Sequence, residues 1–266
     1  MAEPTPNPTG LDAYKPAEVA RRIEEAGIAK AGQAFVPLAT LGVLAGVFIA
    51  FGAAAYTMVM TGVDMAYGPA RLLGGLVFCL GLVLVIVGGA ELFTGNALII
   101  MACVDGKVSA RALLRNWGVT FFTNFAGAAA LAVLVHATGL LSGPMGATAM
   151  AIAKAKVALG FQEAFVRGIL CNALVCLAVW LTFAGHSATD RILAILLPIS
   201  AFVLLGFEHS IANMYLIPAG WLAGAPVTPG GFAHNLLAVT LGNIVGGAGG
   251  VALSYWLAYR PGRTIR

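Results

Sequence analysis

The sequence predicts an all-α membrane protein with six transmembrane helices, two of them broken, arranged as an inverted repeat of three helices. The 266 residues are 60% hydrophobic and only 10% charged, with a mean hydropathy of +0.92, whereas about 25% of the residues of a soluble domain are charged. A bilayer crossing takes about 20 apolar residues, and apolar stretches of about this length or longer occur six times along the chain. Two polar motifs interrupt these stretches and match each other in spacing.

The first 31 residues form a separate polar segment, which we assign to the cytoplasmic side. This segment is rich in proline and charge and lacks the short apolar region of a signal peptide. Residues 17–31 are expected to form an amphipathic helix on the membrane surface. The four cysteines lie in or beside apolar segments without zinc-ligand spacing, so we interpret them as core residues rather than disulfides or metal ligands.

Residues 32–259 form the predicted membrane domain, and residues 260–266 form a basic cytoplasmic tail. The expected spans are 32–60, 72–90, 116–140, 161–183, 192–221 and 232–259. Neither half of the broken span 192–221 is expected to cross the bilayer alone. Residues 104–115 are predicted to be a polar loop, and the glycine- and alanine-rich stretch 141–160 a connection between the third and fourth spans.

The distribution of lysine and arginine predicts the orientation. Six crossings place both termini on one side of the membrane, and that side holds 11 lysines and arginines against 3 on the other. Because cytoplasmic loops carry the excess of positive charge, both termini are predicted to be cytoplasmic.

Two polar breaks organise the membrane domain. One lies at residues 89–96 and the other at residues 206–214. Glu91 and Asn96 are five residues apart, and so are Glu208 and Asn213. Charged side chains inside a membrane span are expensive unless they face a partner or a cavity. We therefore predict two broken helices that meet at mid-depth and line a cavity.

The spans that follow the breaks repeat each other as well. Asn116 and Asn124 are eight residues apart, and so are Asn235 and Asn243. These matches indicate a duplicated unit of three crossings. An odd number of crossings turns the second copy upside down, which is the inverted repeat of channels and transporters.

These motifs resemble those of the formate/nitrite transporter family, and the resemblance covers about residues 35–259. The stretches that carry it are AELFTGN (90–96), GILCNALVCLAVW (168–180), GFEHSIANM (206–214) and NLLAVTLGN (235–243). The resemblance implies an aquaporin-like protomer in a homopentamer, each protomer with its own pore, in a bacterial cytoplasmic (inner) membrane.

His209 is the first candidate pore residue. A histidine titrates near neutrality and can donate a hydrogen bond or a proton to a small anion. The alternative is a buried, neutral side chain with a purely structural role. The resemblance implies that His209 is the central pore histidine, that Asn243 holds it and that Thr94 faces it.

The carboxylates at the breaks have a structural interpretation. We expect Glu91 and Glu208 to accept hydrogen bonds from the exposed backbone N–H groups at their breaks, because a bare negative charge would oppose an anion in the pore. Asparagines are expected to tie the interrupted backbone together. These are Asn96, Asn124, Asn172 and Asn213.

Two apolar constrictions follow from the resemblance. It implies an outer constriction of Phe78 and Phe202, and an inner one of Leu82, Leu92, Phe93 and Val175. The alternative is ordinary core packing. A dry apolar ring excludes hydrated ions, so a formate or nitrite anion would enter at a much higher cost than its neutral acid.

Basic side chains near the outer face complete the candidate site. The resemblance implies that Lys156 concentrates anions in the outer vestibule; the alternative is an interfacial lysine that reaches the surface. Arg167 departs from the apolar residue expected there, and we predict that it pairs with Glu163 four residues earlier.

The predicted function is a channel or transporter for small monovalent anions, with formate first, nitrite second and hydrosulfide third, and with a proton as a possible second partner. A neutral-solute channel is disfavoured, because the breaks lack the Asn-Pro-Ala pairs of aquaporins. We find no nucleophile–base constellation, phosphate loop, metal cluster or nucleic-acid motif, and so predict neither an enzyme nor a cofactor nor a nucleic-acid partner.

Overall fold

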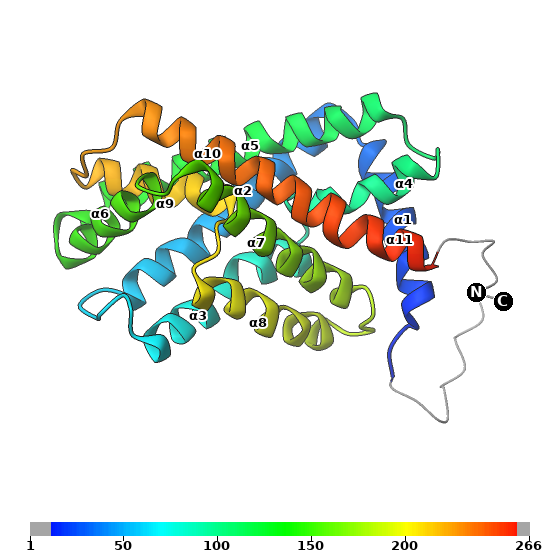
Figure 1. The fold of residues 1–266 in the computed structure, drawn as a ribbon, viewed down its shortest axis with the longest axis horizontal. Coiled ribbons are helices and arrows are strands. Elements are labelled where there is room, and N and C mark those ends of the chain that lie inside the picture. Colours follow the sequence, from blue (N-terminus) through cyan, green and yellow to red (C-terminus); the bar gives the residue numbers. More distant parts are fainter. Residues whose placement is uncertain (1–11, 260–266) are drawn as a thin grey trace.

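The computed structural model describes residues 12–259, and the predicted tail at 260–266 lies outside the described residues. The first half of the chain forms α1 (Pro16–Ala31), α2 (Phe35–Val59), α3 (Gly68–Gly88), η1 (Gly95–Ile99), α4 (Ile100–Val104) and α5 (Ala110–Ala137). The second half forms η2 (Leu140–Ser142), α6 (Pro144–Val157), α7 (Phe161–Thr182), α8 (Ala188–Leu205), α9 (Ser210–Leu222), α10 (Pro229–Ile244), the π-helical stretch η3 (Val245–Ala252) and α11 (Leu253–Tyr259). Figure 1 shows these helices as one bundle.

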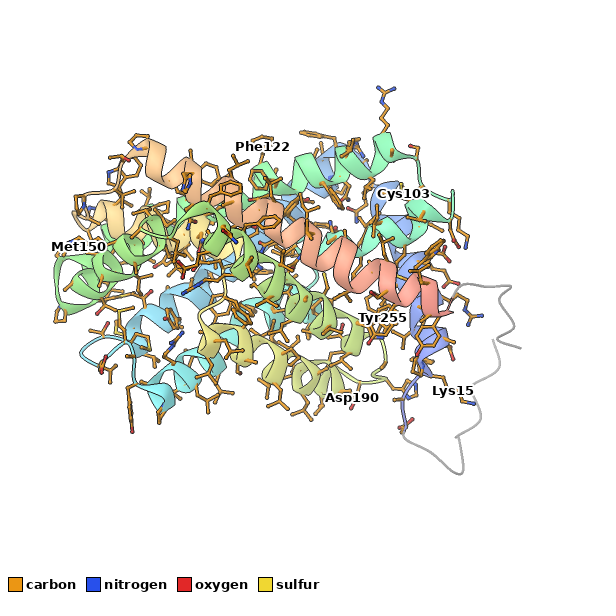
Figure 2. The ribbon with its side chains drawn as sticks, in the orientation of Figure 1. Lys15, Cys103, Phe122, Met150, Asp190 and Tyr255 are labelled. Carbon is orange, nitrogen blue, oxygen red and sulfur yellow. The ribbon has the colours of Figure 1, made fainter. Side chains whose placement is uncertain are left out.

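Within residues 12–259, six helices are long and apolar enough to cross a membrane, as the sequence predicts. They are α2, α3, α5, α7, α8 and the continuous helix of α10, η3 and α11. Large apolar side chains cover much of the outer surface; Phe122, which points outward from α5 in Figure 2, is 69% exposed and Leu197 is 78% exposed. Such a surface suits lipid or a neighbouring subunit rather than water. The chain is an integral membrane protein.

The two halves of the bundle repeat each other. In the first half α2 packs against α3 and α5, and in the second half α7 packs against α8 and α10. The halves meet where α3 packs against α8 and α5 against α9. Helices α1 and α6 each precede the first span of their half, and Figure 1 shows them at opposite ends of the bundle.

Helix α6 corrects the prediction for the connection 141–160. Pro144 occupies its first turn, and five of its 14 residues are alanine. Alanine is the strongest helix former, but a helix this short gives no transmembrane signal. The repeating unit is therefore a short helix followed by three spans, with α6 as the counterpart of α1.

Capping residues also move two helix starts. Ser109 accepts a hydrogen bond from the N–H of Ala112, so α5 begins at Ala110 within the predicted loop 104–115. Ser187 and Asp190 form a capping box that starts α8 at residue 188 rather than 192. The 18 residues of α8 therefore reach about 27 Å, close to the thickness of the hydrocarbon core. The expectation that neither half of this span crosses alone is wrong for α8.

Helix α1 packs on the protein rather than only on a membrane surface. Its apolar side, with Val19, Ala20 and Ile23 buried, faces η1, α4 and α11. Glu24 is buried on the same side, and Lys107 Nζ contacts its Oε2 at 2.6 Å. Burial raises the pKa of the Glu24 carboxyl, and the hydrogen bond from Lys107 opposes that rise. Because docked Glu24 binds its proton more tightly, its contribution to docking is present at low pH and is lost as pH rises through the raised pKa.

Replacing Lys107 with glutamine is expected to loosen α1, because Glu24 then keeps its burial cost without its cationic partner. We expect amide hydrogen exchange across residues 16–31 to accelerate about fivefold, equivalent to ~1 kcal/mol for a half-exposed charged pair. Arg21→Gln is the matched control on the same helix. The Arg21 side chain is 67% exposed, and its contacts with Glu18 and Glu25 are long, at 3.7 Å and 3.9 Å. Equal exchange in both variants would contradict a stabilising role for Lys107.

Candidate functional site

Two glycines end the helices that lead into the breaks. Gly89 follows α3 with a φ of 82°, and Gly206 follows α8 with a φ of 71°. Residues with a side chain rarely adopt this left-handed conformation, which turns the chain out of the helix. Non-helical backbone then leads to η1 in the first half and to α9 in the second.

His209 caps the N-terminus of α9 and contacts the other break. Its Nδ1 accepts a hydrogen bond from the N–H of Ala212 at 3.1 Å, and its Nε2 lies 3.0 Å from Thr94 Oγ1. A backbone N–H can only donate, so the proton of the neutral ring is on Nε2, which donates to Thr94. The ring is 3% exposed. The structure thus brings the predicted pair Thr94 and His209 together, one residue from each break.

Asn243 holds the backbone on both sides of His209 rather than the ring itself. Its Nδ2 donates to the carbonyls of Gly168 and Glu208, both at 2.9 Å, and its Oδ1 accepts from the N–H of Ser210 at 2.9 Å. Its counterpart makes the same three bonds at the first break: Asn124 to Gly42 O at 2.7 Å, to Glu91 O at 2.9 Å and from Phe93 N at 2.9 Å. The inverted repeat therefore extends to individual hydrogen bonds.

The break carboxylates bind side chains rather than the backbone N–H groups that we expected. Glu208 accepts from Lys156 Nζ at 2.8 Å and from Asn213 Nδ2 at 2.7 Å. Glu91 accepts from Lys30 Nζ at 2.7 Å and from Asn96 Nδ2 at 2.8 Å. The expectation is wrong because asparagine oxygens and carbonyls already take the backbone N–H groups at the breaks. Each carboxylate is left to neutralise a lysine.

Lys30 is a site residue that the sequence analysis missed. It pairs with Glu91 as Lys156 pairs with Glu208, and the carbonyls of the two lysines accept from Asn116 at 3.1 Å and from Asn235 at 2.8 Å. A signal was present: Lys30 precedes the first residue of α2 by five positions, and Lys156 precedes the first residue of α7 by the same number.

Other asparagines join the two breaks and their flanking spans. Asn172 donates to the carbonyls of Thr94 at 3.2 Å and Asn243 at 2.7 Å. Asn213 donates to Asn235 at 2.8 Å, and Asn96 donates to Asn116 at 2.9 Å. Asn172, like Asn124, therefore bonds backbone carbonyls, whereas the amides of Asn96 and Asn213 donate to side chains rather than to the interrupted backbone.

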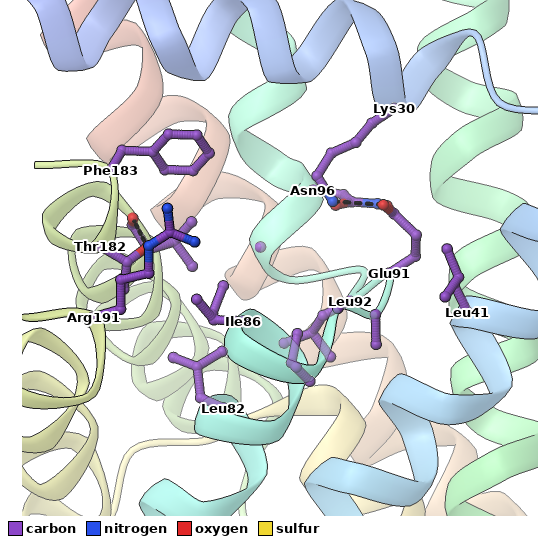
Figure 3. Close-up of a pocket in the computed structure, with 15 residues that line it drawn as sticks. Lys30, Leu41, Leu82, Ile86, Glu91, Leu92, Asn96, Thr182, Phe183 and Arg191 are labelled. Atoms are coloured by element: carbon purple, nitrogen blue, oxygen red, sulfur yellow. Dashed lines mark hydrogen bonds and ion pairs between the residues drawn. The ribbon is translucent and has the colours of Figure 1, made fainter. Parts of the chain in front are cut away.

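A cavity of about 320 Å³, here called the α1 cavity, opens on the side of α1. Figure 3 shows Lys30 and Glu91 on one side of it and Arg191 on the other, with Leu82 and Leu92 at its base. Leu82 and Leu92 are both buried. These two residues of the predicted inner constriction therefore line the α1 cavity.

A second cavity of about 160 Å³, here called the α6 cavity, reaches the other side of His209. Phe78, Phe202 and His209 all line it. The two phenylalanine rings meet edge to face with their centroids 5.5 Å apart, and the Phe202 ring stacks on His209 at 5.9 Å. Phe78 and Phe202, the predicted outer constriction, therefore form an aromatic pair that lines the α6 cavity.

The two remaining constriction candidates line neither cavity. Phe93 packs among the aromatic rings of Trp117 and Phe121 from α5, with centroids 6.3 Å and 5.3 Å away. Val175 is buried in the core on α7. Their part in a constriction stays a prediction.

Arg167 lies at the edge of the α6 cavity. It contacts Glu163 at 2.6 Å, which confirms the predicted pair on one helix face, and it also donates to the carbonyl of Gly206 at 3.1 Å. Its guanidinium therefore fixes the end of α8 as well as its own helix.

Comparison with known proteins places this geometry in a family. The family model described as formate/nitrite transporter matches residues 17–257. The chain is 39% identical over 273 residues to a protein named formate channel FocA from Escherichia coli K12, covering 94% of this chain and 95% of that protein. It is 42% identical over 239 residues to a probable formate transporter from Methanothermobacter thermautotrophicus, covering 82% and 87%.

Solved structures agree with the fold. One titled "FNT family ion channel" matches with a TM-score of 0.85 at 29% identity, covering 91% of this chain and 98% of that one. Another, titled "Pentameric formate channel with formate bound", matches with a TM-score of 0.78 at 42% identity, covering 85% and 97%. This chain belongs to the formate/nitrite transporter family.

Proposed function

We propose that the protein is a pore for formate, with nitrite as the second substrate. The observation that carries the proposal is the buried contact between His209 Nε2 and Thr94 Oγ1, in a bundle where an aromatic pair lines one cavity and a leucine pair lines the other. Relatives named formate channels and a solved channel titled with formate bound support formate first. The family description, which names nitrite, supports the second candidate.

The proposed path runs from the α1 cavity past Leu82 and Leu92 to His209, and past Phe78 and Phe202 to the α6 cavity. Moving a bare carboxylate through two apolar constrictions is expensive, whereas formic acid carries no net charge to desolvate. We therefore infer that formate crosses with a proton. In its neutral form His209 serves this passage as a hydrogen-bond donor that replaces lost water.

Proton transfer from His209 requires a further step. The ring must first gain a proton at Nδ1, which breaks the bond from the Ala212 N–H and places a cation at the N-terminus of α9. A helix N-terminus carries partial positive charge and repels a cation. In our proposal the donor role is therefore the resting one, and the imidazolium forms only when an anion is present to compensate its charge.

The similarity to known channels also supports a proposal for the oligomeric state and the membrane location of the protein. We propose a homopentamer in a bacterial cytoplasmic membrane, supported by the pentameric title of a similar structure and by the exposed apolar faces of the bundle. The excess of positive charge on one side supports cytoplasmic termini, so we place the α1 cavity at the cytoplasmic mouth and the α6 cavity at the outer mouth.

Flux into proteoliposomes tests the proposal. Formate, nitrite and acetate are compared at about pH 5.5 and about pH 7.5, either side of the ordinary histidine pKa of about 6.5, with internal pH recorded. We expect the wild type to carry formate with acidification, and His209→Asn, which keeps an N-cap and a donor, to lose the pH dependence. His209→Phe, which has neither, is expected to lose about tenfold in flux, equivalent to about 1.4 kcal/mol.

His234→Asn is the matched control, because His234 is exposed on α10 and lines neither cavity. It should behave as wild type. Unchanged formate flux and pH dependence in His209→Asn would show that the histidine is structural. If the wild type carries nitrite but no formate, nitrite rather than formate is the substrate of the pore.

A further inference from the structure

Arg71 and Arg191 occupy equivalent places in the two halves of the repeat. Arg71 is the fourth residue of α3 and Arg191 is the fourth residue of α8. Each of these helices leads into one of the two breaks. The inverted repeat therefore sets one arginine toward each mouth of the pore.

Each arginine lines the cavity that contains the break glycine of the other half. Arg191 lines the α1 cavity together with Gly89, and Figure 3 shows it across that cavity from Glu91. Arg71 lines the α6 cavity, where its Nη2 lies 2.6 Å from the position that a Cβ would take on Gly206. The Arg71 guanidinium is therefore beside the backbone turn at Gly206, and the Arg191 guanidinium faces the first break from across the α1 cavity.

The lysines of the cavities are already neutralised. In the α1 cavity the charged side chains are Lys30, Glu91 and Arg191, and the first two form an ion pair of 2.7 Å. Of the described residues that line this cavity, Arg191 alone is left to face an incoming anion. A neutral lysine–glutamate pair contributes little to the attraction of an anion from a distance.

The α6 cavity has the same arrangement. Its charged side chains are Arg71, Lys156, Arg167 and Glu208. Lys156 pairs with Glu208 at 2.8 Å, and Arg167 with Glu163 at 2.6 Å. Across residues 12–259, neither Arg71 nor Arg191 has a side-chain hydrogen bond or an ion pair. The net positive charge that faces the cavity therefore comes from Arg71.

An unpaired guanidinium suits a planar anion. It holds five N–H donors in a fixed fork that matches a carboxylate or nitrite with two parallel hydrogen bonds. Arg71 is partly buried, where a charge is less screened than on an open surface and an ion is bound more strongly, whereas Arg191 is exposed on its side of the α1 cavity.

We propose that Arg71 and Arg191 are entry sites for the anion, one at each mouth, where a small planar oxyanion is held before it reaches His209. The inference rests on the proposed formate pore and adds two binding sites to it. The sites concentrate the anion while it still carries its charge, and the apolar constrictions beyond them then select the neutral form.

The entry sites are tested by replacing each arginine with cysteine and then restoring or reversing its charge by chemical modification of that cysteine. Arg71→Cys and Arg191→Cys are each expected to lower formate flux about fivefold at low ionic strength and less at high salt, because steering by one charge is screened. Reaction with a membrane-impermeant methanethiosulfonate that carries a trimethylammonium group should restore most of the flux. The sulfonate reagent, with the opposite charge, should lower it further.

The reagents should also act from one side only. Added outside intact vesicles, they should change flux through one of the two cysteine variants and not the other, and bound formate should slow the reaction. Lys154→Cys and Arg111→Cys are the controls, because both parent residues are exposed and line neither cavity. Wild-type protein controls for the four native cysteines, three of which are buried.

Three results would overturn the inference: unchanged flux in both arginine variants, equal effects of reagents with opposite charge, or equal effects at the Lys154 and Arg111 controls. Equal effects of both reagents would show that the arginines only support the fold. A wild type that carries no small anion would instead overturn the proposed function, so the two failures are distinguishable.

Discussion

Replacing Gly127 with alanine is expected to remove most of the folded protein, whereas Gly118→Ala on the same helix is expected to leave it intact. A Cβ on Gly127 would lie 2.1 Å from the carbonyl oxygen of Val43 on α2. A backbone atom cannot rotate away, so α2 and α5 must separate. At Gly118 a Cβ would meet no atom within 4 Å.

Separation of α2 and α5 would also disturb the first break. Asn124 lies one turn before Gly127 and donates to Gly42 on α2 at 2.7 Å and to Glu91 O at 2.9 Å. Overpacking a core costs about 1–3 kcal/mol, and more when backbones must move; the lost amide bonds add about 1 kcal/mol each. We therefore expect the melting temperature in detergent to fall by about 10 °C or more.

Gly118→Ala replaces glycine in a helix without a clash and is expected to raise stability by up to about 1 kcal/mol. Thermal unfolding of the two purified variants, followed by size-exclusion chromatography, makes the comparison. Melting temperatures within about 2 °C of each other would contradict the tight α2–α5 contact. Loss of formate flux in Gly127→Ala at an unchanged melting temperature would contradict it as well.

Spacing in the sequence was enough to predict the repeat, because the same chemistry recurs at the same intervals. The five-residue step from Glu91 to Asn96 and from Glu208 to Asn213 becomes a carboxylate–amide hydrogen bond of 2.8 Å in one half and 2.7 Å in the other. A short-range pattern of this kind predicts a contact reliably, because both residues lie in the same break.

Long-range pairs were harder to predict. Lys30 and Glu91 are 61 residues apart and meet only because α1 docks across the end of the bundle. Hydropathy, the strongest signal in a membrane protein, identifies spans and overlooks short helices outside them. Helix α6 was not predicted for that reason, and the symmetry between Lys30 and Lys156 was therefore not predicted either.

Lys156→Met is expected to have the largest effect of any change in the α6 cavity. Lys156 is 14% exposed and Glu208 5% exposed in their side chains, so the variant would leave a buried carboxylate with Asn213 as its remaining donor. Removing one partner of a buried ion pair costs about 3–5 kcal/mol. The uncompensated charge would also lie one residue from His209 and repel the anion, so formate flux is expected to fall at least about tenfold.

The double variant Lys156→Met/Glu208→Gln separates the two roles of the lysine. If Lys156 acts by neutralising Glu208, a neutral glutamine that still accepts from Asn213 should restore both melting temperature and flux. If Lys156 acts on the anion through its own charge, the double variant should recover stability but not flux. A single variant equal to wild type in both measurements would contradict either role.

Lys30→Met provides the matched comparison from the other half of the repeat. Lys30 is 31% exposed, and Glu91 keeps a contact of 3.5 Å from Gln33 in addition to Asn96. Among residues 12–259, no glutamine donates to Glu208 as Gln33 donates to Glu91. The cost of Lys30→Met should therefore be smaller than that of Lys156→Met, about 1–3 kcal/mol. Equal losses would mean that exposure and the extra donor do not matter, and that the fold depends on the two ion pairs equally.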